Sequence, residues 1–419
     1  MALQNPALFS ATIALSATHR KSLSYNGPYA YDADKLIASL KATSLRHLRK
    51  DLDDAGNRSI DSLIATIRTL CLCEVYAGTD CPGTWRAHLE GARALIIALK
   101  SSNHPISLDR DGSTRFLRRW FGVTEDMVAL TADGFPQGTF DDGANFDTLT
   151  AGMSTESVYL DEYTGYSTDL SLLFREIGAA ARQQHRASDI AQDAEAFDGN
   201  DISRQADMLE QSLRRMIDRD KSKPPKFDSR VAKLLSAQQA KEFYLCNEAS
   251  QHTALIHLVR RVRKLPASSP IVQKSVKRIL DCISSIMSAP PSPLAVLTTP
   301  LFTAGCEALG TDRDLVRRLL SNMFRLMRIP NMRRSLEVLE EYWASSECKG
   351  NDGWESFMRI VLPILCLAHF STNQPRPAKV GLLTLLRVPS PIRYGSEGLI
   401  LTWKPKLFEA KEMGYELFV

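Results

Sequence analysis

The sequence predicts an all-α protein, a two-lobed helical array or bundle with a long irregular crossing segment. Apolar residues recur at i, i+3, i+4 and i+7 over most of the chain, and no segment alternates with the period two of strands. Gly, Asp, Thr and Pro accumulate in the middle, as in TADGFPQGTFDDGANFD. We therefore expect an N-terminal helical lobe at 1–100, an irregular connection at 101–168, a C-terminal helical lobe at 169–370 and an atypical tail at 371–419.

The N-terminal lobe is predicted to contain helices at residues 32–52, 59–76 and 84–99. In 59–76 the apolar positions fall on one helical face, with Ser59 as a suitable N-cap: Ile60, Leu63, Ile64, Ile67, Leu70 and Cys71. The next helix carries a matching stripe: Trp85, His88, Leu89, Ala92, Leu95, Ile96 and Leu99. The short link at 77–83 favours antiparallel packing of these two helices.

The C-terminal lobe is predicted to contain seven helices, at 168–182, 229–264, 272–286, 301–309, 313–328, 332–344 and 354–369. Pro266 ends the second of these, and a proline-rich stretch at 290–293 ends the third. Residues 183–200 are polar and predict a loop. Beyond residue 371 no period is present, so the tail has no predicted structure.

Composition and charge narrow the class of protein. The chain has 419 residues, of which 44% are hydrophobic and 24% charged, typical of a soluble globular protein. A net charge of +4 does not indicate a dedicated DNA-binding domain, which would concentrate basic residues in a stripe. No apolar run approaches the length of about 18 residues needed to span a membrane. The apolar N-terminus has no basic residues after Met1, so we interpret it as a buried helix rather than a signal peptide.

Eight cysteines are spread over the chain without any Cys-x-x-Cys pair, which is typical of reduced, buried thiols in an intracellular protein. Cys71 and Cys73 share a helix and point about 200° apart, so they cannot bind one metal ion. The sequence also has no nucleophile elbow, Walker loop, dinucleotide-binding glycine motif or His-Glu-x-x-His motif. We therefore expect no metal, no cofactor and no enzymatic activity.

Five residues are candidates for a pocket or for a family signature. Trp85 and His88 lie on one helical face and could form a ligand pocket. The favoured interpretation is that both belong to the core, where the histidine is satisfied by hydrogen bonds. Glu307 lies in the apolar stretch FTAGCEAL and needs a partner there. The favoured interpretation is an interhelical lock with Arg313 or a more distant arginine, and the alternative is a functional acid. Gly91 and Gly305 predict close approach of helices.

Two basic runs have alternative interpretations. Residues 118–121, Arg-Arg-Trp-Phe, could form a nucleic-acid surface, but a helix with arginines around core aromatics is favoured. The run Arg260, Arg261, Arg263 and Lys264 could be a nuclear localisation patch. Its place at a helix C-terminus, where cations are favourable, supports a structural role.

Several clusters in series resemble the fungal-specific transcription factor domain, the second of the two large families with that name and the middle homology region of zinc-cluster regulators. The most recognisable stretch of that family is similar to LIATIRTLCLCEVYAG followed by GTWRAHLEGARALI in this chain. Glu74, Trp85 and His88 are among the residues that match its pattern. NPALFSATIALSATH, DEYTGYSTDLSLLFREI, ALIHLVRRVRKLP and TPLFTAGCEA resemble its other segments, and Trp343 and Trp354 are placed as the family has them. The resemblance covers about residues 5–365.

The resemblance implies an effector-responsive regulatory module that controls transcription by RNA polymerase II, located in the nucleus, with the cytoplasm as the alternative. It implies a small-molecule effector and protein partners from the transcription machinery. The six clustered cysteines of the zinc cluster are missing from this chain, so we expect no specific DNA binding by the chain alone. The alternatives are a standalone metabolite-binding protein or enzyme of fungal secondary metabolism that reuses this domain, and a helical scaffold for protein contacts.

Overall fold

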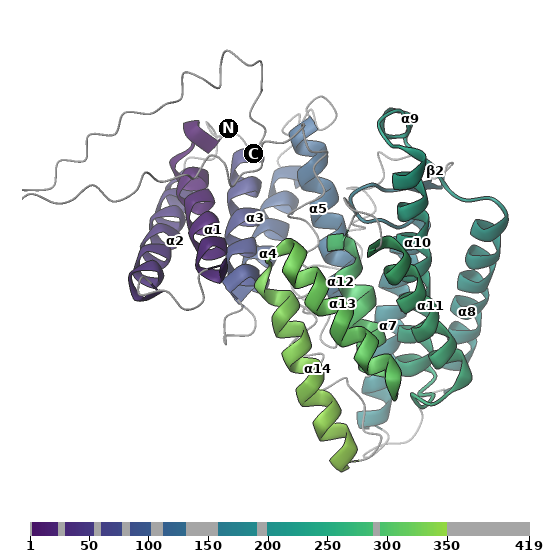
Figure 1. Cartoon of the computed structure of the whole chain (residues 1–419). Helices are drawn as coiled ribbons and strands as arrows, with labels where there is room; N and C mark the ends of the chain where they lie inside the picture. Colours follow the sequence, from purple (N-terminus) through teal and green to yellow (C-terminus); the bar gives the residue numbers. More distant parts are fainter. Residues whose placement is uncertain are drawn as a thin grey trace, which may run out of the picture.

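The computed structural model describes residues 2–23, 30–53, 60–77, 84–101, 112–130, 158–190, 199–287 and 294–349. Within these ranges the prediction of an all-α fold is confirmed, because helices account for nearly every element (Figure 1). The described strands, β1 (Tyr159–Leu160) and β2 (Lys226–Phe227), form one short parallel pair with Tyr159 opposite Lys226. No helix in the described ranges is long and apolar enough to cross a membrane.

The first part of the chain forms a group of helices that starts with the 3₁₀ turn η1 (Ala2–Gln4). It continues with α1 (Pro6–Leu23), α2 (Ala30–Asp53), α3 (Ile60–Ala77), α4 (Thr84–Ser101) and α5 (Gly112–Ala129). Asn5 caps α1, since its Oδ1 accepts a hydrogen bond from Leu8 N at 2.8 Å. The buried residues of α1 include Ala7, Ala11 and Ala14, and these small side chains let the backbones of α1, α2 and α3 approach closely.

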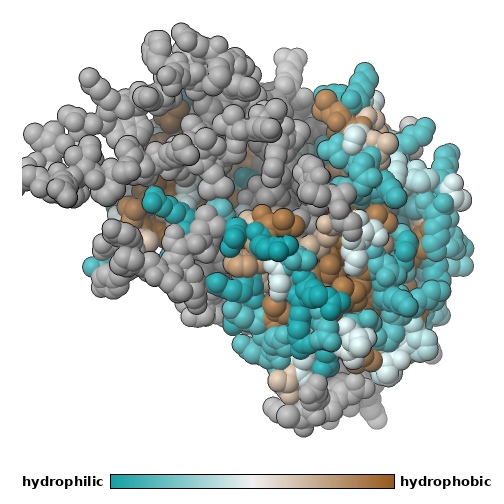
Figure 2. Space-filling view, in the orientation of Figure 1, coloured by the Kyte–Doolittle hydropathy of each residue, from teal (hydrophilic) through white to brown (hydrophobic). Residues whose placement is uncertain are grey.

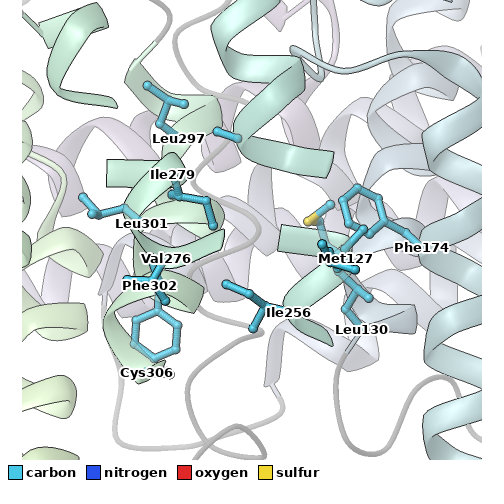
Figure 3. Packing of buried hydrophobic residues seen from close by; sticks show 14 of the residues in the cluster. Met127, Leu130, Phe174, Ile256, Val276, Ile279, Leu297, Leu301, Phe302 and Cys306 are labelled. Atoms are coloured by element: carbon cyan, nitrogen blue, oxygen red, sulfur yellow. The ribbon is translucent and has the colours of Figure 1, made fainter. Parts of the chain in front are cut away.

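The second part of the chain forms a larger helical group around α10 (Ala237–His257). Its other elements are α7 (Thr168–Ile190), α8 (Gly199–Ser222), α9 (Ser229–Ala232), the π-helix η2 (Leu258–Val262), α11 (Pro270–Met287), η3 (Leu294–Leu297), α12 (Thr298–Glu307), α13 (Thr311–Met327) and α14 (Pro330–Lys349). In Figure 3 Ile256 of α10 lies between Met127, Leu130 and Phe174 on one side and Val276, Leu301 and Phe302 on the other. The central helix therefore connects the two sides of the core.

Two hydrophobic clusters hold the molecule together, and they share two helices. One lies among α1 to α5 and contains Trp85 and Trp120, and the other lies among α7 to α14. Helix α3 contributes Leu70 to the first and Leu72 to the second, while α5 contributes Phe121 to the first and Met127 to the second. On the face in Figure 2, hydrophilic residues predominate over the second group and apolar residues form small separate areas. The predicted division into two lobes remains a prediction.

The structure corrects the prediction that residues 101–168 form an irregular connection. Helix α5 occupies Gly112–Ala129, because Leu117, Trp120, Phe121 and Val128 recur at helical spacing and are buried. The Gly-rich residues that dominated this prediction, 132–147, lie outside the described residues.

Three further boundaries differ from the sequence prediction. Helix α7 continues to Ile190 through part of the predicted loop at 183–200. Helix α8 was not predicted, because its many charged residues hide a buried face that includes Ile202, Leu209 and Leu213. The predicted helix 229–264 is divided, since Ser236 begins α10 with a capping box to Gln239. The predicted helix at 354–369 and the tail at 371–419 lie outside the described residues.

Candidate functional site

Trp85 lies in the packed core of the first helical group. Its side chain is 4% exposed and belongs to the cluster that contains Leu63, Ile67 and Leu89. Helix α4 packs on α3, and Cys71 Sγ donates a hydrogen bond to Trp85 O at 3.7 Å. The geometry therefore corresponds to the core interpretation of Trp85.

His88 lies one turn further along α4 and points to a buried carboxylate instead. Its Nε2 is 3.9 Å from Glu74 Oε1, and Lys41 of α2 forms an ion pair with the same oxygen. Burial raises the pKa of Glu74, but the contacts from His88 and Lys41 outweigh it, so the pKa of this carboxyl lies below its ordinary value. Lys41, Glu74 and His88 thus join α2, α3 and α4 through one polar contact.

Glu307 ends α12 and is 1% exposed. Arg260 Nε donates to Glu307 Oε1 at 2.7 Å, and Arg260 Nη1 also donates to Leu265 O. The partner of Glu307 is therefore the more distant arginine of the two predicted alternatives. Arg313 instead donates a hydrogen bond from its Nε to Ala308 O at 3.0 Å. Removing one partner of a buried ion pair typically costs about 3–5 kcal/mol, so this contact fixes α12 against the end of α10.

The two predicted glycines behave differently. A Cβ on Gly305 would lie 2.6 Å from Leu339 Cδ1, and Gly305 O accepts a hydrogen bond from Trp343 Nε1 at 2.9 Å. Gly305 therefore permits the close approach of α12 and α14. Gly91 differs, because it is exposed on α4 and, among the residues that the structure describes, no atom lies within 4 Å of its Cβ position.

The three arginines of the basic run at 260–264 are held by partners within the protein, with Arg261 buried and Arg263 at the surface. Arg260 binds Glu307, Arg261 Nη1 donates to Leu130 O at 2.5 Å, and Arg263 Nη2 donates to Asp207 Oδ1 at 2.6 Å. Lys264 is exposed and has a left-handed backbone with φ of 55°. These contacts agree with the structural interpretation of the run.

Three side chains of the basic-aromatic run on α5, those of Arg119, Trp120 and Phe121, have partners within the protein. Trp120 and Phe121 are buried and pack edge to face, with ring centroids 5.6 Å apart. Arg119 Nη1 donates to Glu162 Oε1 at 2.6 Å, and its guanidinium lies over the ring of Tyr163. Bases cannot stack on buried rings, so the described side chains of this run, Arg119, Trp120 and Phe121, fit the interpretation of arginines around core aromatics.

The sequence analysis did not identify Asp126, which is the centre of a second buried polar cluster. Its carboxylate accepts hydrogen bonds from Arg175 Nε at 2.6 Å, Tyr166 Oη at 3.2 Å and Ser171 Oγ. Burial raises the pKa of Asp126 and outweighs the opposing effect of Arg175. The sequence contains a signal for this cluster, because Asp126 interrupts an apolar helical face as Glu307 does. It was missed because residues 101–168 were predicted to be irregular.

Five cysteines have described side chains, and these are buried and free: Cys71, Cys73, Cys246, Cys282 and Cys306. Cys71 and Cys73 donate to carbonyls on different helices, Trp85 O and Ala11 O, as their predicted divergence requires. Burial raises the pKa of Cys73 to about 12, and a thiol that stays protonated is a poor metal ligand or nucleophile. The described part of the chain contains no group of three or more His, Cys, Asp or Glu side chains that could hold a metal ion.

Comparison with known proteins gives one match. The family model of the fungal specific transcription factor domain matches residues 1–366, which include both hydrophobic clusters and every described element. No curated protein and no solved structure matches the chain.

Proposed function

The chain belongs to the fungal specific transcription factor domain family, and from this premise we propose that it is an effector-responsive module that controls transcription by RNA polymerase II. The observation that carries the proposal is the extent of the match, because residues 1–366 contain the whole helical array. Membership favours a transcription regulator over an enzyme. We further propose a nuclear location, a small-molecule effector and partners from the transcription machinery.

The buried polar contacts support the responsive part of the proposal. Glu74, Asp126 and Glu307 each join different helices, and each is held by a cationic side chain. Such contacts specify particular helix arrangements, because a helix that shifts must separate buried charges. An effector that favours one arrangement over another would change the surface offered to a partner.

A tethered reporter assay tests this function. The full chain is fused to a heterologous DNA-binding domain, and the transcript of a reporter with matching sites is measured in a fungal host grown on different carbon and nitrogen sources. We expect output to change by about fivefold or more between conditions, at the lower end of typical allosteric coupling. Output equal to that of the DNA-binding domain alone in every condition would contradict the proposal.

DNA binding by the chain itself is a separate question. We propose that the chain acts through a partner and binds DNA only weakly and in a salt-sensitive manner, because its net charge is only +4 and Arg119 and Arg261 of its basic runs bind partners within the protein. Mobility-shift assays with the purified chain measure this at physiological salt. Nanomolar affinity for one sequence would contradict it.

A further inference from the structure

The π-helix η2 at the end of α10 is an unusual element with an unusual set of contacts. It closes a hydrogen bond from Arg263 N to Leu258 O at 3.2 Å, five residues apart, and Leu265 N reaches back to Val259 O at 3.0 Å. Such wide turns are rare and are frequent at functional positions. Lys264 then takes a left-handed backbone, which reverses the chain direction. The turn therefore sets where each of its side chains points.

Three arginines of this segment reach three different helices. Arg260 binds Glu307 at the end of α12, and Arg263 binds Asp207 and Glu210 of α8, with Nε 2.8 Å from Glu210 Oε2. Arg261 is buried and donates to Leu130 O, directly after the last turn of α5. A short segment thus contacts one helix from the first cluster and two from the second.

The end of α5 is docked on the second group at three points. Besides Arg261, Arg182 of α7 donates to Ala129 O at 2.7 Å, which satisfies another carbonyl at the helix C-terminus. A Cβ on Gly178 would lie only 2.0 Å from Ala129 O, so the backbone of α5 rests directly on α7. Because α5 carries Trp120 and Phe121 of the first cluster, its end connects that cluster to η2.

His257 and Thr303 connect α12 to the same place. His257 Nδ1 is 3.4 Å from Arg261 Nη1, and its Nε2 is 3.5 Å from Thr303 Oγ1 on α12. Arg260 and Arg261 are consecutive, so a change of turn type that rotates one also rotates the other. If Arg260 moves away, Glu307 loses the bond to its guanidinium, and if Arg261 moves away, Leu130 O loses its donor. Each loss is costly in a buried site.

We propose that η2 is a conformational coupling element that links the position of α12 to the docking of α5. Its two states are the observed π turn, in which Arg260 and Arg261 both hold their partners, and a regular α-helical turn, in which they cannot both do so. A displacement of α12 then releases α5, and a displacement of α5 releases α12.

Hydrogen–deuterium exchange of the full-length protein tests the coupling. The variant Glu307→Gln keeps the shape of the side chain but weakens its bond to Arg260. Amide exchange in residues 258–265 and in the last turn of α5, residues 126–130, is expected to become at least about tenfold faster, while peptides from α1 and α2 keep their wild-type rates. The two regions are far apart in the sequence and are joined in the structure by the bond from Arg261 to Leu130 O, so faster exchange in both is the result expected of coupling through η2.

Glu340→Gln is the matched control. It weakens an Arg–Glu ion pair with the same Nε to Oε1 geometry, 2.6 Å between Arg317 and Glu340, which lies partly exposed between α13 and α14 instead of buried. Exchange is expected to change only near residues 317 and 340. Faster exchange at 126–130 in this control as well would show that any loss of stability has the same effect, and would overturn the proposal.

A second variant covers the case in which Glu307→Gln does not fold. Arg260→Lys keeps a cation beside Glu307 but loses the planar fork that also reaches Leu265 O, so it is expected to give the same pattern with smaller rate changes. The proposal is overturned if exchange rises at 258–265 while 126–130 keeps its wild-type rate. It is equally overturned if rates rise by the same factor in every peptide.

Discussion

At the scale of single residues, Trp85 has the largest predicted effect on stability. Its ring is buried in the first cluster, so Trp85→Ala is expected to lower the free energy of unfolding by about 3–5 kcal/mol. Urea denaturation followed by circular dichroism measures this change. The control Trp85→Phe keeps an aromatic ring and should cost clearly less. A Trp85→Ala protein as stable as the wild type that no longer responds in the reporter assay would instead place Trp85 in an effector site.

His252 gives a prediction for the dependence of stability on pH. Burial lowers the pKa of His252 to about 4, against 6.5 for the free side chain, and Nδ1 lies 3.2 Å from Ser275 Oγ. Between pH 4 and pH 6.5 this histidine is protonated in the unfolded chain but neutral in the folded protein. Its contribution to the free energy of unfolding is therefore fully present above pH 6.5 and is lost as the pH falls toward 4. Acidification from pH 7 to 5 should cost about 2 kcal/mol from this residue.

Urea denaturation at pH 7 and pH 5 measures the loss of stability on acidification for the wild type and for His252→Asn. The variant should lack the part of this loss that comes from His252. Ser275→Ala removes the hydrogen-bond partner but keeps the imidazole, so the pH dependence should remain. The lowered pKa of buried His257 acts in the same direction, so His252→Asn should reduce the acid sensitivity without abolishing it. An unchanged difference between pH 7 and pH 5 in His252→Asn would contradict the prediction.

At the scale of elements, the docking of α5 on α7 depends on the glycine at position 178. Gly178→Ala places a Cβ 2.0 Å from Ala129 O, so the helices must separate, at a cost of about 1–3 kcal/mol or more. Gly91→Ala is the matched control on exposed α4, where added helix propensity should stabilise by about 0.5–1 kcal/mol. Urea denaturation measures both variants. Equal effects of the two substitutions would mean that α5 does not rest on α7 as described.

At the scale of the whole molecule, the two hydrophobic clusters are not independent. Helices α3 and α5 each place side chains in both clusters, so neither cluster keeps its full core without the other. We expect a single cooperative unfolding transition of the full chain, with coincident curves from circular dichroism and tryptophan fluorescence. Two separated transitions would show that the two helical groups are independent folding units.

The sequence by itself determined the helical class, most helix positions and the need for a buried polar contact at Glu307. The apolar spacing within α3 and α4 is a local property, because residues three and four apart share a face in any α-helix. A carboxylate inside an apolar face, as at Glu307, has to find a partner in any fold that buries that face. The divergence of Cys71 and Cys73 likewise follows from helix geometry alone.

Only the tertiary structure decided which elements meet. Arg260 rather than Arg313 binds Glu307 across 47 residues, and Arg261 reaches Leu130 across 131. Whether a glycine is required depended on what lies opposite its Cα. At Gly178 this is a backbone carbonyl, whereas Gly91 is exposed and has no described atom near its Cβ position. Local spacing fixes the direction of a side chain on its own helix. The atom that it meets depends on how all the helices pack together, and no single segment contains that information.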